Sequence, residues 1–284
     1  MSQQLLLPDG THLSYRVLGE NTKALPLIMI CGLAMSKDEW YPSCDELAKH
    51  RQVLIFDNRG INESTPIPDS SFTMEILAQD TISLANHLGW RDVGVLGFSM
   101  GGMIAQTLVT RLTGALRVQK LILVSTGPSK SICMEFFRLL FVGTDILVSS
   151  NPDPSKLDSY SRELFIIDFT PQWVAENSET IDLKYTEYFK LPRPEHVVLR
   201  QIEAAKQFDV REELPKLNIP TLILQGDCDQ VMGVEDSRLM HRLIPNSRYL
   251  LLPGIGHDIF TMHPEILREV DQFLCGKEAS GETL

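Results

Sequence analysis

The sequence predicts an α/β fold in which a mostly parallel central sheet is flanked by helices and carries an inserted helical cap. Two observations predict the sheet: short runs that are apolar almost throughout recur along the chain, and helix-like stretches separate the earlier ones. One observation predicts the cap, because no such apolar run occurs between Gly127 and Lys216, where the pattern is helical instead.

The strands follow in order from the N-terminus. The segment LLLPDGTHLSYRVLG predicts two strands joined by a hairpin turn at Asp9-Gly10. Six further apolar runs have the composition of strands covered on both faces: 25–32, 52–57, 93–98, 120–126, 220–227 and 248–254. Helix-like stretches such as 73–88 and 101–113 lie between the earlier runs, which favours parallel strands joined by right-handed crossovers.

The middle of the chain is expected to form a helical cap of residues 128–216, with 1–127 and 217–284 forming the core domain. Structureless loops of that length are rare. We expect most of the cap's aromatic side chains to hold its helices together and the remainder to face the substrate. The window between Gly127 and Lys216 holds seven of the 12 phenylalanines: Phe136, Phe137, Phe141, Phe165, Phe169, Phe189 and Phe208.

Composition limits the classes of protein to which the chain can belong. A formal net charge of −11 over 284 residues argues against a nucleic-acid partner and against an anionic membrane. The first residues lack a signal-peptide pattern, no apolar stretch reaches the length of a membrane span, and the five scattered cysteines lack metal-ligand spacing. We therefore expect a cytoplasmic protein whose partner is a small-molecule substrate. Whether it is a monomer or a homodimer is open.

The stretch VGVLGFSMGG places a serine among glycines where an apolar run ends and a helix-like stretch begins. Gly97-Phe98-Ser99-Met100-Gly101 matches the G-x-S-x-G pattern of a nucleophilic serine on a sharp strand-to-helix turn, and this is the context that the pattern requires. Small neighbours let strand and helix pack closely at such a turn. The alternative is a glycine-rich turn whose serine only caps a helix.

A reactive serine also needs amide donors for the oxyanion that forms during attack. The helix that begins after Ser99 presents the Met100 amide at its N-terminus. The segment MICGLAMS ends an earlier strand, where Gly32-Leu33 offers a second backbone N–H, that of Leu33. On its own, a glycine after a strand indicates only a turn.

The base and the acid that orients it are expected at later strand ends. LILQGDCDQVM supplies Asp227 and Asp229 after one strand, and LLLPGIGHDIF supplies His257 in a loop after the next. The order Ser, Asp, His is that of one serine-hydrolase scaffold, and open α/β sheets build their sites at these strand ends. Either aspartate can instead form a turn or cap, and a metal site there lacks further ligands. The other histidines do not directly follow a predicted strand: His12, His50, His87, His196, His241 and His263.

These residues resemble the α/β-hydrolase family over nearly the whole chain. The resemblance rests on GFSMGG, DNRG, IPTLILQGDCD and GIGH. It implies that Ser99 is the nucleophile, Asp229 the acid and His257 the base, with the amides of Leu33 and Met100 as the oxyanion hole. In this family a serine at this turn permits esterases, lactonases, thioesterases, carbon–carbon bond hydrolases, hydroxynitrile lyases and cofactor-free haloperoxidases. Epoxide hydrolases and haloalkane dehalogenases of this fold have aspartate instead.

Two residues depart from the family's pattern. Many relatives have histidine where this chain has Cys31. The difference changes a side chain near the oxyanion loop but not the backbone donor. We expect the Cys31 thiol to pack in the core. Asn62 stands where relatives commonly have glycine, which predicts a change in the shape of its loop. Asp57 is expected to hold that loop together and not to take part in the chemistry.

We therefore expect a serine hydrolase that cleaves a small, largely apolar ester or lactone through an acyl-enzyme, with no metal or organic cofactor. Gly32, Cys31 and Phe98 near the serine, with Phe137 and Phe141 of the cap, are the expected substrate contacts. Two alternatives stay open: a carbon–carbon bond hydrolase or lyase using the same triad, and a ligand-binding or receptor-like protein with little turnover.

Overall fold

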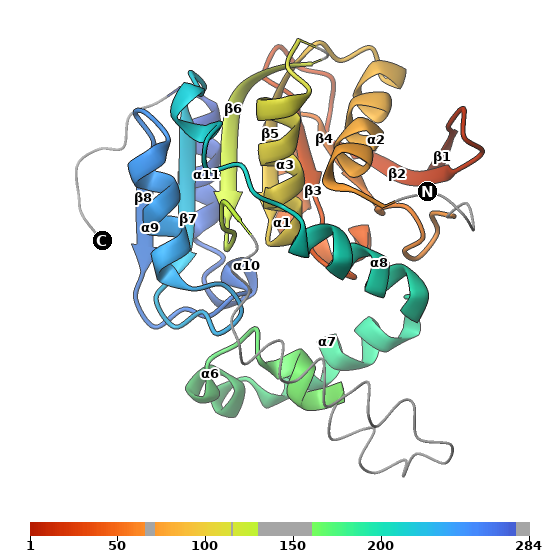
Figure 1. Ribbon diagram of the computed structural model, residues 1–284. Coiled ribbons are helices and arrows are strands. Elements are labelled where there is room, and N and C mark those ends of the chain that lie inside the picture. Colours follow the sequence, from red (N-terminus) through yellow and green to blue (C-terminus); the bar gives the residue numbers. More distant parts are fainter. Residues whose placement is uncertain (66–71, 115, 130–160, 277–284) are drawn as a thin grey trace.

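The computed structural model describes residues 1–65, 72–114, 116–129 and 161–276. An eight-stranded sheet lies at its centre in the order β1-β2-β4-β3-β5-β6-β7-β8 (Figure 1). β2 is antiparallel to both of its neighbours and the remaining pairs are parallel, which confirms the mostly parallel sheet. The strands are β1 (Gln3–Leu6), β2 (His12–Leu18), β3 (Leu27–Ile30), β4 (Val53–Phe56), β5 (Asp92–Phe98), β6 (Arg117–Val124), β7 (Thr221–Gly226) and β8 (Arg248–Leu252).

Helices cover both faces of the sheet and continue beyond the carboxyl ends of its parallel strands (Figure 1). None of those in the described residues is long and apolar enough to cross a membrane. The helices are η1 (Lys37–Trp40), α1 (Ser43–Ala48), α2 (Met74–His87), α3 (Met100–Arg111), α6 (Pro171–Glu176), α7 (Ser178–Lys190), α8 (Glu195–Lys206), η2 (Leu214–Lys216), α9 (Val234–Leu243), α10 (Ile259–Met262) and α11 (Ile266–Leu274).

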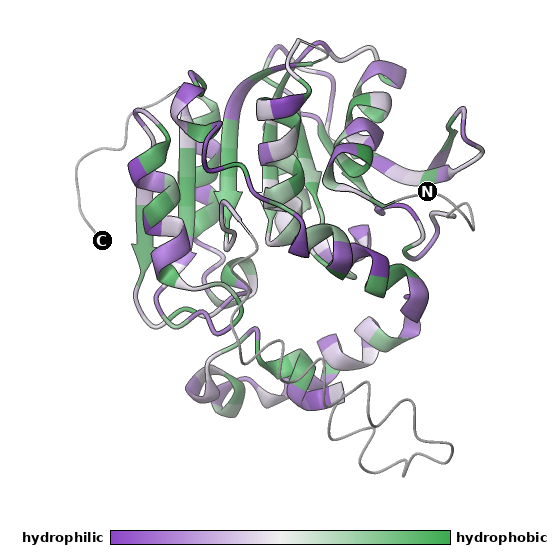
Figure 2. Cartoon of the chain, in the orientation of Figure 1, coloured by the Kyte–Doolittle hydropathy of each residue, from purple (hydrophilic) through white to green (hydrophobic). Residues whose placement is uncertain are grey.

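Both faces of the central strands are buried, which explains why their sequences are apolar throughout. Successive residues of a strand point to opposite faces. In β3, Ile28 and Ile30 belong to the buried cluster that includes α2 and α3, whereas Leu27 and Met29 belong to the cluster with α1 and α11. Figure 2 shows the central strands as mostly hydrophobic and the helices as mixed, with polar residues distributed along them. The predicted covering of the sheet on two sides is confirmed.

The predicted hairpin at the N-terminus is also present. β1 and β2 pair in antiparallel register, with Leu6 opposite His12. The Asp9 carboxylate accepts a hydrogen bond from the Thr11 amide at 2.9 Å, and Gly10 has a φ of +86°, a conformation that glycine adopts without steric cost.

A helical cap is inserted between β6 and β7. Residues 161–166 are helical, and α6, α7 and α8 follow them. Figure 1 shows α6 and α7 beyond the carboxyl ends of the strands, with α8 leading back to the sheet. Aromatic rings pack between the cap helices, since the Phe165 ring lies 5.6 Å from that of Tyr185 and 5.9 Å from that of Phe169. The expected contributions of Phe136, Phe137 and Phe141 lie outside the described residues.

Candidate active site

Ser99 occupies the turn between β5 and α3 in a conformation that few non-glycine residues adopt. Its φ is +54° and its ψ is −122°, and such strain costs of the order of 1–3 kcal/mol. A Cβ atom at Gly101 would lie 2.1 Å from the Ile30 carbonyl oxygen, and one at Gly97 would lie 2.3 Å from the Gly101 carbonyl oxygen. The two outer glycines of G-x-S-x-G are therefore required by close backbone contact. The turn presents Ser99, which is half-buried, at the carboxyl edge of the sheet.

Two backbone amides next to Ser99 are available to a developing oxyanion. Met100 is the first residue of α3, so its N–H has no partner within the helix. The loop after β3 approaches from the other side, because a Cβ atom at Gly32 would lie 3.3 Å from Ser99 Cβ. Among the described residues, neither the Leu33 amide nor the Met100 amide donates to a protein acceptor. The sequence analysis predicts these two amides as the oxyanion hole, and that role stays a prediction.

His257 lies in the loop after β8 with its Nδ1 atom 2.8 Å from Asp229 Oδ2. Both side chains are buried. The Asp229 carboxylate is held on all sides, since Oδ1 accepts the amides of Val231 and Met232 at 2.8 Å each and Oδ2 accepts Gln225 Nε2 at 2.9 Å. An aspartate fixed in this way can hold the imidazole in one orientation and one tautomer.

Asp227, the other aspartate of the same loop, does not contact His257. Its Oδ1 atom accepts the Gly254 amide at 2.7 Å, and the residue is exposed. This bond closes the turn after β8, so Asp227 organises the loop that carries His257. The structure distinguishes the two aspartates, because Asp229 bonds His257 whereas Asp227 bonds the Gly254 amide.

The histidine loop is tied to the rest of the site through its backbone. The Ser125 hydroxyl donates to the His257 carbonyl at 2.8 Å, and the Asp258 amide donates to the Asp168 carbonyl of the cap at 3.0 Å. The Phe98 ring, adjacent to Ser99 in sequence, lies 5.0 Å from the imidazole ring. The hydrogen bonds among the described residues do not include one from Ser99 to His257; catalytic pairs of this kind are often long before substrate binds.

Acidic groups around His257 set its protonation. Burial lowers the pKa of His257, but the adjacent Asp229 carboxylate, with Asp168 and Asp258, outweighs burial and raises it to about 8. Burial raises the pKa of Asp168 to about 7, an effect that the nearby His257 partly opposes. The Asp168 side chain has no hydrogen-bond or ion-pair partner among the described residues. The cap thus places a carboxyl group beside the imidazole.

The predicted departures from the family pattern have structural explanations. Asn62 has a φ of +49°, which asparagine tolerates better than most residues, so it can replace glycine. Its side chain donates to Ser36 Oγ and Asp57 Oδ2 at 3.0 and 3.2 Å. Asp57 also accepts Lys37 Nζ at 2.6 Å, with both side chains fully buried. Asp57 therefore bonds both its own loop, through Asn62, and the start of η1, through Lys37, which agrees with the structural role expected of it.

Cys31 is in the core and is not retained as a substrate contact. Its side chain has no exposed surface, its thiol donates to the Phe56 carbonyl at 3.3 Å, and burial raises its pKa well above the usual range. The strand before the oxyanion loop points this side chain into the sheet packing. Gly32 and Phe98 do adjoin Ser99, whereas Phe137 and Phe141 lie outside the described residues.

Several residues at the site were missed by sequence reasoning. Gln225 is a polar residue inside the apolar run TLILQG, and that contrast was its signal. Asp168 and the cap residues Arg193 and Gln201, described below, have no local signal, because only the fold brings the cap to the site. In the part of the chain that the structure describes, no group of three or more His, Cys, Asp and Glu side chains is arranged to hold a metal ion.

Comparison with known proteins supports the same architecture. The sequence pattern of the family described as alpha/beta hydrolase fold matches residues 26–264. A protein of Azorhizobium caulinodans named carbamate hydrolase RutD is 26% identical over 93% of this chain and 95% of its own. An esterase of Thermogutta terrifontis superimposes with a TM-score of 0.80 at 25% identity, covering 97% of this chain and 98% of the esterase. The enol-lactonase of Burkholderia xenovorans superimposes with a TM-score of 0.81 at 22% identity, covering 96% of this chain and all of the lactonase chain.

Proposed function

Because the chain belongs to the alpha/beta hydrolase family, we propose that it is a serine hydrolase that cleaves small, largely apolar esters or lactones. The observation that carries the proposal is the 2.8 Å contact between Asp229 and His257 at the edge of the sheet where Ser99 occupies its strained turn. A structural role needs none of these three features. Ser99 is the proposed nucleophile, His257 the base and Asp229 the residue that orients the base.

The proposed reaction has two halves. His257 Nε2 takes the hydroxyl proton as Ser99 Oγ bonds to the carbonyl carbon, and the carbonyl oxygen becomes the oxyanion that the Leu33 and Met100 amides bind. His257 then gives the proton to the leaving alcohol oxygen, which departs as the carbon–oxygen bond breaks. Water repeats the sequence on the acyl-enzyme, releasing the acid and restoring Ser99. No step requires a metal or an organic cofactor.

We propose that the cap, residues 128–216, covers this site and sets the substrate preference over a core of 1–127 and 217–284. The packing of Phe98 against His257 gives the site an apolar wall. Burial of a small molecule between such a wall and a cap favours apolar acyl groups. The carboxyl of Asp168, which has no side-chain partner among the residues that the structure describes, is the polar exception.

Carbamates are a second candidate substrate class. The relative named carbamate hydrolase RutD spans nearly the same length, and a carbamate differs from an ester in having nitrogen on the carbonyl carbon. The Asp168 carboxyl, raised to a pKa of about 7 by burial, can accept a hydrogen bond from that nitrogen when ionised. The same serine, histidine and aspartate would then act through a carbamoyl-enzyme.

The test begins with a fluorophosphonate, which requires no knowledge of the substrate. Intact-mass spectrometry should show a single adduct on the wild type and none on Ser99→Ala. Turnover of para-nitrophenyl butyrate, a small lactone and phenyl carbamate by the same preparations then identifies the substrate class. Asp168→Leu, which removes the acceptor oxygens, should reduce the rate on the carbamate more than the rate on the ester if Asp168 binds the nitrogen.

Two results would turn the proposal toward the alternatives. An adduct at Ser99 without turnover of any of these compounds points to a carbon–carbon bond hydrolase or lyase, which uses the same residues on another bond. Absence of an adduct, together with thermal stabilisation by a small ligand, points to a binding protein. An adduct that survives in Ser99→Ala would remove Ser99 from the mechanism.

A further inference from the structure

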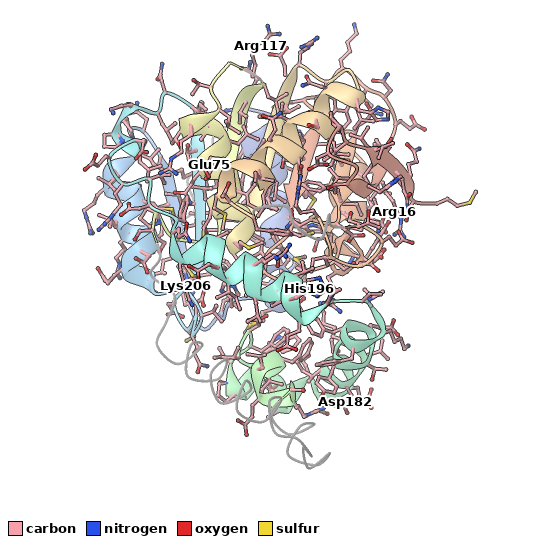
Figure 3. The ribbon with its side chains drawn as sticks, turned by 45° about the vertical axis from the view of Figure 1, so that its right-hand side comes forward. Arg16, Glu75, Arg117, Asp182, His196 and Lys206 are labelled. Atoms are coloured by element: carbon pink, nitrogen blue, oxygen red, sulfur yellow. The ribbon has the colours of Figure 1, made fainter. Side chains whose placement is uncertain are left out.

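Two residues of the cap hold the residue that follows the proposed oxyanion donor. The Ala34 amide donates to Gln201 Oε1 at 2.9 Å, and the Ala34 carbonyl accepts Arg193 Nε at 2.6 Å. Gln201 comes from α8, and Arg193 from the LPRP segment that joins α7 to α8. In Figure 3, α8, which carries His196 and Lys206, lies between the sheet and α7, which carries Asp182. Both peptide groups of Ala34 are thus bonded to the cap.

Arg193 is itself fixed. Its guanidinium also donates to the Tyr188 carbonyl, to the Leu191 carbonyl at 3.2 Å and to the Glu39 carboxylate, and it lies 3.6 Å from the centre of the Tyr188 ring. Only 8% of the Arg193 side chain is exposed, and Gln201 is completely buried. A planar donor that bonds several carbonyls at once has little freedom to move.

The same segment is joined to a second loop of the core. The backbone N–H of Asn62 donates to the Pro192 carbonyl at 2.7 Å. Pro192 and Pro194 flank Arg193, and proline limits the backbone to few conformations. The LPRP segment therefore acts as a stiff strap across the loops that follow β3 and β4.

The conformation of the turn explains why it needs such support. Residues Gly32 to Met35 form a turn closed by the Met35 amide on the Gly32 carbonyl at 3.4 Å, and Ala34 at its third position has a φ of +55°. Glycine is the usual residue where a turn needs a positive φ. Within one peptide plane C=O and N–H point in opposite directions, so the bond to the Gly32 carbonyl directs the Leu33 N–H away from the turn.

We propose that Arg193 and Gln201 are positioning residues that hold the Ala34 turn so that the Leu33 amide faces the oxyanion formed at Ser99. The inference rests on the proposed serine-hydrolase function and deepens it. The oxyanion hole is then shared between core and cap: the core supplies the donor, and the seated cap supplies its orientation. Displacing the cap would lower transition-state binding without removing a group that touches the substrate.

The experiment compares Arg193→Met and Gln201→Met with wild type on para-nitrophenyl butyrate. A displaced donor should lower kcat by about 10- to 100-fold and leave KM within about twofold, because ångström-scale misplacement costs of the order of 10² in rate. Affinity for a boronic acid, whose tetrahedral adduct on Ser99 occupies the oxyanion hole, should fall in parallel with kcat. The matched control is Arg162→Met, which removes a cap arginine whose ion pair with Asp182 is exposed; its kcat and boronate affinity should be unchanged.

Ala34→Gly supplies a rescue that a merely structural role does not predict. Glycine adopts the positive φ without strain, so adding it to Arg193→Met should recover part of the lost kcat. If Arg193→Met fails to fold, Arg193→Lys replaces it, because lysine keeps the charge beside Glu39 but has too few donors, and no planar fork, to bond three carbonyls and that carboxylate at once. Folded variants with wild-type kcat and boronate affinity overturn the proposal, as does a loss confined to KM or thermal stability. Lack of both an adduct and turnover in the wild type overturns the proposed function itself.

Discussion

His257 Nδ1 lies 2.8 Å from Asp229 Oδ2, and that carboxylate is held in place by two backbone amides and by Gln225. An ionised aspartate only accepts hydrogen bonds, so a neutral His257 must carry its proton on Nδ1. Nε2 is then left with a free electron pair, which is what a base acting on a hydroxyl needs. The structure thus fixes the tautomer through Asp229 before any substrate arrives.

Replacing Asp229 should therefore impair catalysis far more than replacing its neighbour. In Asp229→Asn the amide can donate to Nδ1, which favours the wrong tautomer, and kcat should fall by about 10⁴. Asp227→Asn should lower kcat less than tenfold, because Asp227 only closes a turn with the Gly254 amide. Steady-state kinetics on para-nitrophenyl butyrate compare the two. The opposite ranking would transfer the role of the acid to Asp227.

Activity should depend on pH through His257. The base works when neutral, and its pKa is raised to about 8, so kcat/KM should rise with pH and reach half of its plateau near pH 8. Asp229, Asp168 and Asp258 are the acidic groups that raise this pKa. Asp168→Asn removes one negative charge and should move the midpoint to lower pH.

The matched control is Asp92→Asn, which removes a carboxylate from the exposed pair with Arg117. Its pH profile should coincide with that of the wild type. A midpoint that stays in place in Asp168→Asn would mean that the cap carboxyl does not act on His257. Initial rates from pH 5 to 10, with enzyme stability checked at each pH, give both midpoints.

The arrangement of the candidate site could be predicted from the sequence where it is encoded locally. Ser99 stands in a short motif whose glycines are needed because a side chain there would collide with backbone atoms. His257 lies in the loop that follows an apolar strand. The local sequence left Asp227 and Asp229 both open, because the choice depends on which one reaches a histidine about thirty residues later, and only the family resemblance assigned the acid to Asp229. The contacts of Arg193 and Gln201 with Ala34 span 159 and 167 residues. No pattern in the cap indicates them, since the folded sheet alone brings the two segments together.

The fold was predictable for a related reason. Strands buried on both faces leave apolar runs, and the cap interrupts those runs. Asn62 shows the limit of such reasoning, because its departure from glycine looked like a change of loop shape. The structure instead keeps the positive φ and uses the side chain to bond Ser36 and Asp57.

The turn at Ser99 should tolerate no side chain at Gly101. In Gly101→Ala the new Cβ would lie 2.1 Å from the Ile30 carbonyl oxygen, so strand β3 or helix α3 must shift. The loss of unfolding free energy should reach the upper end of the roughly 1–3 kcal/mol that overpacking costs, or exceed it. Gly233→Ala is the control, because its nearest neighbouring atom lies 3.7 Å away, and it should change stability by less than about 0.5 kcal/mol. Equal melting temperatures for the two variants would contradict the close contact.

The buried pair of Lys37 and Asp57 should stabilise the loops beneath the cap. Both side chains are fully buried with Nζ and Oδ2 2.6 Å apart, so Lys37→Met leaves the Asp57 charge without its partner. Breaking a buried pair in this way costs about 3–5 kcal/mol. Lys49→Met removes an exposed pair with Glu46 and should cost about 0–1 kcal/mol. Urea unfolding followed by circular dichroism measures both differences.

Because Asp57 also binds Asn62, which bonds the cap at Pro192, Lys37→Met should reduce kcat as well. A variant that loses stability but keeps full kcat would show that this cluster supports the fold without reaching the oxyanion loop.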